Sequence, residues 1–312
     1  MKTERQAYLL LATVIVLWGA NWPIMKVGVE HIPPLWFASS RLLLGAVCVF
    51  ALNVARGRLS LPDRRDVSVL VSVGFLQLGL GLALIHVALG VVEAGRSAIL
   101  AYTTPLWVIP LAVFVLGEKI HLAKAIGLAL GLAGVAVLFN PREIDFSDSA
   151  ELIGNGYLII AAMAGAVVMV HVRHHRMFTP PLQMLPWQML MGGVILAFTA
   201  LYFDGVPEIT WTPSLVAIVA YNGPIASAFC FWAYLNVMRS LPATSTALGS
   251  LGVPVAGMAF SALSLGETMS IGKLMGLALI SSGLVVLIIG DFKRKSRSKS
   301  ENDENNAFPR LP

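Results

Sequence analysis

Residues 94–139 read AGRSAILAYTTPLWVIPLAVFVLGEKIHLAKAIGLALGLAGVAVLF, and residues 243–288 read ATSTALGSLGVPVAGMAFSALSLGETMSIGKLMGLALISSGLVVLI. The two stretches align without a gap, and the matched positions include Pro105 with Pro254, Glu118 with Glu267, Lys124 with Lys273 and Gly134 with Gly283. Two apolar stretches that carry proline, glycine and charged residues at the same spacing, half a chain apart, indicate an internal duplication. In a membrane protein, such a duplication is typical of a secondary transporter.

The composition places the chain in a bilayer. Hydrophobic residues make up 57% of the sequence and charged residues 12%, about half the charged fraction of a soluble domain. Apolar runs of roughly 20 residues recur along the chain, which is the length a helix needs to cross a membrane. These runs are too long and too uniformly apolar for the strands of a barrel. The sequence therefore predicts an all-α polytopic membrane protein in contact with the lipid bilayer.

The apolar runs predict ten transmembrane helices. They lie near residues 6–27, 34–55, 67–92, 95–116, 121–139, 152–172, 181–203, 213–238, 243–265 and 271–290. We expect a first repeat over residues 1–140 and a second over 151–290. Residues 291–312 are charged and polar, and we expect them to form a disordered cytoplasmic tail.

Basic residues predict the orientation. Ten spans place the Lys and Arg residues of the N-terminus, of four connections and of the C-terminal tail on one side, and the acidic connection 140–151 on the other. Because Lys and Arg accumulate on the cytoplasmic side, both termini are predicted to be cytoplasmic. This placement explains the net charge of +5 without a nucleic-acid partner. Five spans per half also means that the two repeats are inverted in the membrane, with a site expected at the midplane between them.

Several motifs resemble a known family. The first span contains WGANWP, the fourth and ninth each carry a proline and end in LGE, and the eighth contains FWAYL before LPA. These features resemble the paired EamA domains of the drug/metabolite transporter superfamily, over nearly the whole chain except its tail. The resemblance implies a ten-helix carrier in the cell inner membrane, and the family includes YddG-like exporters of amino acids and other metabolites. Family membership does not fix the substrate.

Polar side chains within the spans are the candidates for the substrate path, because polar atoms that face lipid are costly. The candidates are Trp18, Asn21, Trp22, Arg41, Gln77, His86, Tyr102, Thr104, Trp107, Tyr221, Asn222, Trp232 and Tyr234. Trp22 fits an interfacial aromatic belt equally well. Pro105 and Pro254 are candidate hinges, because a proline inside a helix frees a carbonyl and favours a kink.

Four of the sequence features allow more than one interpretation. Arg41 suits a substrate carboxylate, and it suits equally an anchor to helix carbonyls or to a loop acid such as Glu93. His86 suits proton coupling, but a neutral imidazole bonded within the helix bundle is favoured. The segment from Asn222 to Pro224 suits either exposed carbonyls or a plain kink. Glu118 and Glu267 suit substrate ligands, but residues that fix turns and form pairs are favoured.

Other functions find less support. No Asp or Glu lies at the centre of a predicted span, so the coupling ion stays undetermined. His171, His174 and His175 form a histidine cluster without a carboxylate, and a solvated basic loop explains it better than an intramembrane enzyme. No nucleotide-binding loop is present, Cys48 and Cys230 lie in apolar runs, and no cofactor or metal is expected. We expect a transporter of small metabolites, with amino acids as the leading class and hydrophobic or cationic drugs as the alternative, that functions as a monomer.

Overall fold

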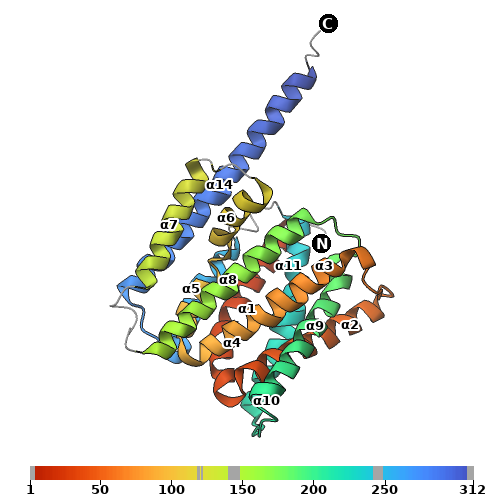
Figure 1. The fold of residues 1–312 in the computed structure, drawn as a ribbon, viewed down its shortest axis with the longest axis vertical. Helices are drawn as coiled ribbons and strands as arrows, with labels where there is room; N and C mark the ends of the chain where they lie inside the picture. Colours follow the sequence, from red (N-terminus) through yellow and green to blue (C-terminus); the bar gives the residue numbers. More distant parts are fainter. Residues whose placement is uncertain (1–3, 118–119, 121, 140–147, 242–248, 308–312) are drawn as a thin grey trace.

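The computed structural model describes residues 4–117, 120, 122–139, 148–241 and 249–307, and all of the elements in these ranges are helices. In chain order they are α1 (Glu4–His31), α2 (Pro34–Ala55), the 3-10 turn η1 (Arg64–Asp66), α3 (Val67–Val71), the π-helix η2 (Ser72–Gly81), α4 (Leu82–Val91), α5 (Ala94–Ala101), α6 (Thr104–Leu116), α7 (Leu122–Leu138), α8 (Ser149–His174), α9 (Pro181–Phe203), α10 (Pro213–Ala220), the π-helix η3 (Tyr221–Phe229), α11 (Cys230–Ser240), α13 (Gly252–Leu265) and α14 (Ile271–Ala307) (Figure 1).

The prediction of ten spans is confirmed. Within the described ranges, eight helical segments are long and apolar enough to cross a membrane, and α7 and α13 are shorter apolar helices. The 17 residues of α7 cover about 25 Å at 1.5 Å per residue, close to the roughly 30 Å of the hydrocarbon layer. The expected start of the ninth span at residue 243 lies outside the described residues.

The third and eighth spans each contain a π-helical segment that the apolar pattern did not predict. η2 begins at Ser72 and η3 begins at Tyr221, and these two residues correspond under the alignment that places Ala94 on Ala243. π-Helical segments are rare and occur often at functional sites. Their recurrence at equivalent positions extends the duplication from sequence to backbone conformation.

The fourth span is broken, where one continuous helix was expected. α5 ends at Ala101 and α6 begins at Thr104. Pro105 lies in the first turn of α6, and because it has no N–H it cannot donate to the carbonyl of Ala101, as a continuous helix would require. That carbonyl instead accepts from the hydroxyl of Thr104 at 3.2 Å, and the carbonyl of Leu100 accepts from the backbone N–H of Thr103 at 3.1 Å and from its hydroxyl at 2.6 Å. In the second repeat, α13 likewise begins two residues before Pro254.

The glycines shared by the two copies bring α7 and α14 into backbone contact. A Cβ atom built on Gly283 would lie 2.6 Å from the carbonyl oxygen of Gly127, and one on Gly134 would lie 2.8 Å from that of Gly276. Small residues of this kind allow helices in membranes to approach closely. The two helices lie side by side at one edge of the molecule (Figure 1).

The last helix extends into the region of the expected disordered tail. α14 continues to Ala307, and Figure 1 shows its last part extending beyond the end of α7. Residues 308–312 lie outside the described residues, and the cytoplasmic location expected for the tail stays a prediction. Once a helix is nucleated, each further residue is added at small cost, so a membrane helix can propagate into a polar sequence that would not nucleate one itself.

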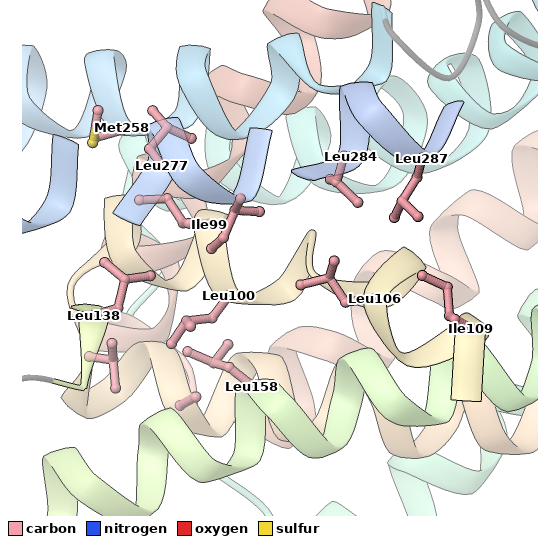
Figure 2. Packing of buried hydrophobic residues seen from close by; sticks show 13 residues of the cluster. Ile99, Leu100, Leu106, Ile109, Leu138, Leu158, Met258, Leu277, Leu284 and Leu287 are labelled. Carbon is pink, nitrogen blue, oxygen red and sulfur yellow. The ribbon is translucent and has the colours of Figure 1, made fainter. Parts of the chain in front are cut away.

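The two sequence halves are interleaved. α2 packs along α9, α1 along α13 and α4 along α8, and each of these pairs joins the first half to the second. One buried apolar cluster also draws on both halves (Figure 2); it includes Ile99, Leu100, Leu106, Leu138, Leu158, Met258, Leu277 and Leu284. The five-helix halves are therefore not two separate bodies, and the cavity described below is enclosed by helices from both.

Candidate functional site

A cavity of about 260 Å³ lies among α1, α2, η2, α4, the break between α5 and α6, α8 and α11. It is lined by Trp18, Asn21, Trp22, Met25, Arg41, Gln77, Leu78, Gly81, Leu82, Ile85, Ala101, Tyr102, Thr104, Ala161, Ala162, Gly165 and Phe231. Seven of the predicted path residues are in this set. The volume is at the lower end for small-molecule sites, which suits a small metabolite.

One face of α1 forms a wall of the cavity. Trp18, Asn21, Trp22 and Met25 follow the spacing that places side chains on the same side of a helix. Asn21 is 4% exposed, and its Oδ1 atom accepts no hydrogen bond from the described residues. Trp22 is 6% exposed, so its ring packs in the protein interior beside the cavity. Met25 was not among the predicted residues, although its spacing from Trp18 places it on the same face.

Trp18 connects α1 to the π-helical segment of the second half. Its Nε1 donates to the carbonyl of Ala226 in η3 at 2.9 Å. Its ring contacts those of Phe231 and Tyr234, with centroid distances of 5.5 and 5.3 Å. The segment that contains Pro224 is thus a π-helix with a carbonyl bonded to a cavity residue, rather than a plain kink.

Arg41 is buried at the cavity, and its hydrogen bonds in the described part of the chain go to neutral groups. It is 5% exposed, its Nε donates to Ser227 Oγ at 3.2 Å, and a terminal nitrogen lies 2.8 Å from Met25 Sδ. Glu93, the anchor considered from sequence, instead forms an ion pair with Lys273. In the described ranges, no Asp or Glu pairs with Arg41, and none lines the cavity.

Gln77, Tyr102 and Thr104 complete the polar lining. Gln77 comes from η2, and Tyr102 lies in the break between α5 and α6. Thr104 begins α6, and its hydroxyl donates to the carbonyl of Ala101 at 3.2 Å. A π-helix and a helix break, two irregular parts of the backbone, therefore each supply a polar side chain to the same cavity.

The remaining predicted path residues lie away from the lining. His86 is fully buried one turn beyond Leu82; its Nδ1 lies 2.8 Å from the Leu82 carbonyl oxygen, and its ring packs against Phe37 at 5.4 Å. Trp107 donates to the hydroxyl of Thr103 at 3.1 Å, within its own span. Their hydrogen bonds are local to their own helices, so they stabilise the walls.

On the eighth span, the predicted residues Tyr221, Asn222, Trp232 and Tyr234 lie outside the lining of the cavity. Tyr221 donates from its hydroxyl to the carbonyl of Leu17 at 2.7 Å, which joins η3 to α1. Asn222 is fully buried and donates to a carbonyl of its own span at 3.1 Å. The ring of Trp232 lies 5.7 Å from the guanidinium carbon of Arg56, at the end of the molecule that carries the 56–66 connection. Among the aromatic residues of this span, Phe231 lines the cavity, although the sequence did not predict it. The span contains a π-helix, so a regular helical period does not show which residues face the cavity.

A carboxylate joins the two halves at the end that carries connection 56–66, called here the basic end. Asp66 is fully buried and accepts from the backbone N–H of Thr179 at 2.6 Å and of Phe178 at 3.1 Å. His175 Nε2 lies 2.9 Å from the same carboxylate. Nearby, hydrogen bonds from the side chain and backbone of Arg65 lower the pKa of the partly exposed Asp63 carboxyl to about 2. We call the contact of Asp66 with the second half the basic-end clamp.

A similar arrangement lies at the opposite end. Glu267 accepts from the backbone N–H of Ala94 at 2.6 Å and of Gly95 at 2.9 Å, one bond to each carboxylate oxygen. These amides open α5, where a helix favours negative charge. Lys273 pairs with Glu93 beside them. We call this contact the opposite-end clamp. Its sequence counterpart Glu118 lies outside the described residues.

A larger groove is a poorer candidate. It measures about 430 Å³ and is lined by Ala20, Pro23, Ile24, Val27, Ile218, Phe260, Leu263, Ser264 and Leu265. Apart from Ser264 this lining is apolar, so it offers few groups that could orient a polar metabolite.

Ten membrane helices from two inverted repeats around an interior polar cavity define a polytopic membrane carrier. Comparison with known proteins agrees, because the profile described as the EamA-like transporter family matches residues 5–140 and 152–289. The chain therefore belongs to the EamA-like transporter family of the drug/metabolite transporter superfamily, and it is a transporter and not an enzyme.

Its relatives include proteins of Gram-positive and Gram-negative bacteria. It is 30% identical over 287 residues to the protein named Uncharacterized transporter YoaV of Bacillus subtilis, covering 91% of this chain and 97% of that one. It is 26% identical over 305 residues to the Probable amino-acid metabolite efflux pump of Salmonella typhimurium, covering 92% and 96%. A solved crystal structure aligns with a TM-score of 0.63 at 23% identity, over 90% of this chain and 95% of that one, which shows the shared fold.

Proposed function

We propose that the protein is a secondary transporter that exports small metabolites across the inner membrane by alternating access, with amino acids as the leading substrate class. The observation that carries this proposal is the cavity itself, which is enclosed by both repeats and lined by amide, aromatic and guanidinium groups. An amide and aromatic rings suit a zwitterion with an apolar side chain. Relatives named as probable amino-acid metabolite efflux pumps support the same class.

The basic end faces the cytoplasm in this proposal. Arg56, Arg58, Arg64 and Arg65 lie in one short stretch there, and such clusters stay on the cytoplasmic side. Both termini are then cytoplasmic. A relative named as an inner membrane transporter supports the location. Because helices of a single chain enclose the cavity, the functional unit is a monomer.

The two clamps are the gates. Each uses a carboxylate of one half to bind backbone amides of the other, Asp66 at the basic end and Glu267 at the opposite end. Opening either side of the cavity breaks one clamp and keeps the other. Both are formed in this structure, which we assign to an occluded state. The bends that accompany opening are placed at Pro105 and Pro254, beside the break before α6 and the start of α13.

Uptake into proteoliposomes that hold the purified full-length protein tests the proposal. Labelled amino acids are offered as a panel, with and without a pH gradient. We expect saturable uptake of a subset and its loss in Asn21→Ala, because Asn21 lines the cavity. Asn236→Ala is the matched control, since Asn236 bonds to the Trp232 carbonyl of its own helix at 2.7 Å and lies outside the lining. Absence of uptake for every amino acid contradicts the proposed class.

A further inference from the structure

No acidic group among the described residues pairs with the buried charge of Arg41. A guanidinium stays protonated in proteins and carries five N–H donors. In the parts of the chain that the structure describes, Arg41 uses two of its nitrogens, toward the hydroxyl of Ser227 and the thioether of Met25. Both partners are neutral, and a thioether is a weak acceptor. Buried charges in proteins are normally paired or bound to an ion, and the residues that the structure describes provide no such partner for this arginine.

The cavity offers the place for that partner. Arg41 is 95% buried and still belongs to the lining, together with Asn21, whose Oδ1 accepts no bond from the described residues. The lining thus presents an unbalanced guanidinium and an unused amide oxygen. A guanidinium binds a carboxylate or a phosphate through two parallel hydrogen bonds. A carboxylate carries the single negative charge that one guanidinium balances, whereas a phosphate group carries about −1.5 to −2.

We infer that Arg41 is the residue that selects the substrate, and that the cavity takes monocarboxylates, with an α-carboxylate on Arg41. This inference rests on the proposed function and names the ligand chemistry of its site. An α-ammonium group lies against Asn21 Oδ1 and the faces of Trp18, Trp22 and Tyr102, which attract cations weakly. Organic cations without a carboxylate are excluded, because Arg41 repels them and no described acidic residue in the lining offsets that repulsion.

Three molecules with one carbon skeleton separate the contributions. Leucine carries both charged groups, 4-methylpentanoate lacks the ammonium group, and 3-methylbutan-1-amine lacks the carboxylate. The purified full-length protein is titrated with each, and binding is followed by tryptophan fluorescence, since Trp18 and Trp22 line the cavity. We expect leucine and 4-methylpentanoate to bind at least about 10-fold tighter than the amine, because a charge-assisted hydrogen bond to Arg41 increases affinity by at least that factor.

Substitution of Arg41 identifies the group responsible. Arg41→Gln is expected to weaken both carboxylates by about 10-fold to 100-fold and to leave the amine unchanged or slightly improved. Arg41→Lys keeps the positive charge but loses the planar guanidinium that donates two parallel hydrogen bonds. It should therefore still bind the two carboxylates more tightly than the amine, at lower affinity than the wild type. This variant keeps the test possible if Arg41→Gln does not fold. Arg58→Gln, which removes one exposed charge at the basic end, is the control and leaves all three affinities unchanged.

The outcomes distinguish this inference from the proposed function. If the amine binds as tightly as the acids, or if no carboxylate binds at about 10 mM, the inference is overturned. It is also overturned if Arg41→Gln weakens the amine as much as the acids, since Arg41 would then act on the fold alone. If acids bind through Arg41 while proteoliposomes transport none, the inference stands and the proposed transport fails. If uptake occurs without any effect of Arg41→Gln on substrate affinity, transport stands and the inference fails.

Discussion

Replacing Glu267 by glutamine should open one side of the transporter. The carboxylate accepts two backbone hydrogen bonds, at 2.6 Å from Ala94 and at 2.9 Å from Gly95. Glutamine removes the charge and turns one acceptor into a donor, so one of the two N–H groups loses its partner. A hydrogen bond to a charged group contributes about 1.5–3 kcal/mol net. The closed state at this end should therefore lose about 2–3 kcal/mol, which shifts the ratio of open to closed molecules by about 30-fold to 160-fold.

Thiol labelling from outside the cell measures that shift. A cysteine introduced at Met25 reports on the cavity, in a background where Cys48 and Cys230 are replaced by alanine. In the proposed orientation the opposite end faces outward, so Glu267→Gln should raise the labelling rate by a membrane-impermeant maleimide. The matched control is Glu208→Gln, an exposed acid in the connection between α9 and α10.

The other clamp provides the reverse test. Asp66→Asn weakens the contacts at the basic end, where the carboxylate accepts from Thr179 at 2.6 Å and Phe178 at 3.1 Å. If the two clamps alternate, this variant should lower the labelling rate of the Met25 cysteine from outside. Equal rates in wild type and Glu267→Gln, or a rise in both clamp variants, would refute the assignment of the clamps as gates on opposite sides.

Two further predictions concern the helices. Gly283→Ala should lower the melting temperature of the purified protein, because the new Cβ would lie 2.6 Å from the carbonyl oxygen of Gly127. Gly156→Ala is the control: its new Cβ would have no atom within 4 Å, so the melting temperature should stay unchanged or rise. Equal melting temperatures of the two variants would show that α7 and α14 can separate without cost. Pro105→Ala combined with Pro254→Ala should slow transport if these positions are hinges, and unchanged rates of transport and thiol labelling would remove them from the mechanism.

The helix count and the duplication could be predicted because they depend on strong, local signals. A membrane crossing fixes the length of an apolar run, and the matched glycines and prolines keep their spacing in both copies. The α1 wall of the cavity could be predicted for a similar reason: Asn21 is costly in lipid and must face the interior, and helical spacing carries Trp18 and Trp22 with it.

The clamps could not be predicted in the same way. Asp66 lies in a connection with several charged neighbours, and nothing local distinguishes it from a solvated acid. Its burial depends on how closely the connection around Thr179 approaches, which tertiary packing decides. Phe231 was missed because a π-helical segment precedes it, so its helix face could not be assigned from a regular period. The break in the fourth span separates Tyr102, which lines the cavity as predicted, from Trp107, which bonds to Thr103 and does not.

The central claim is that this cavity carries a small metabolite across the membrane. Counterflow tests it most directly: proteoliposomes are loaded with unlabelled amino acid, and the transient accumulation of the labelled form is followed. The account predicts an overshoot of at least one amino acid in wild-type protein and in Asn236→Ala, and none in Asn21→Ala, whose substitution alters the cavity lining. Absence of an overshoot for every amino acid in wild-type protein, or an equal overshoot in Asn21→Ala, would contradict it.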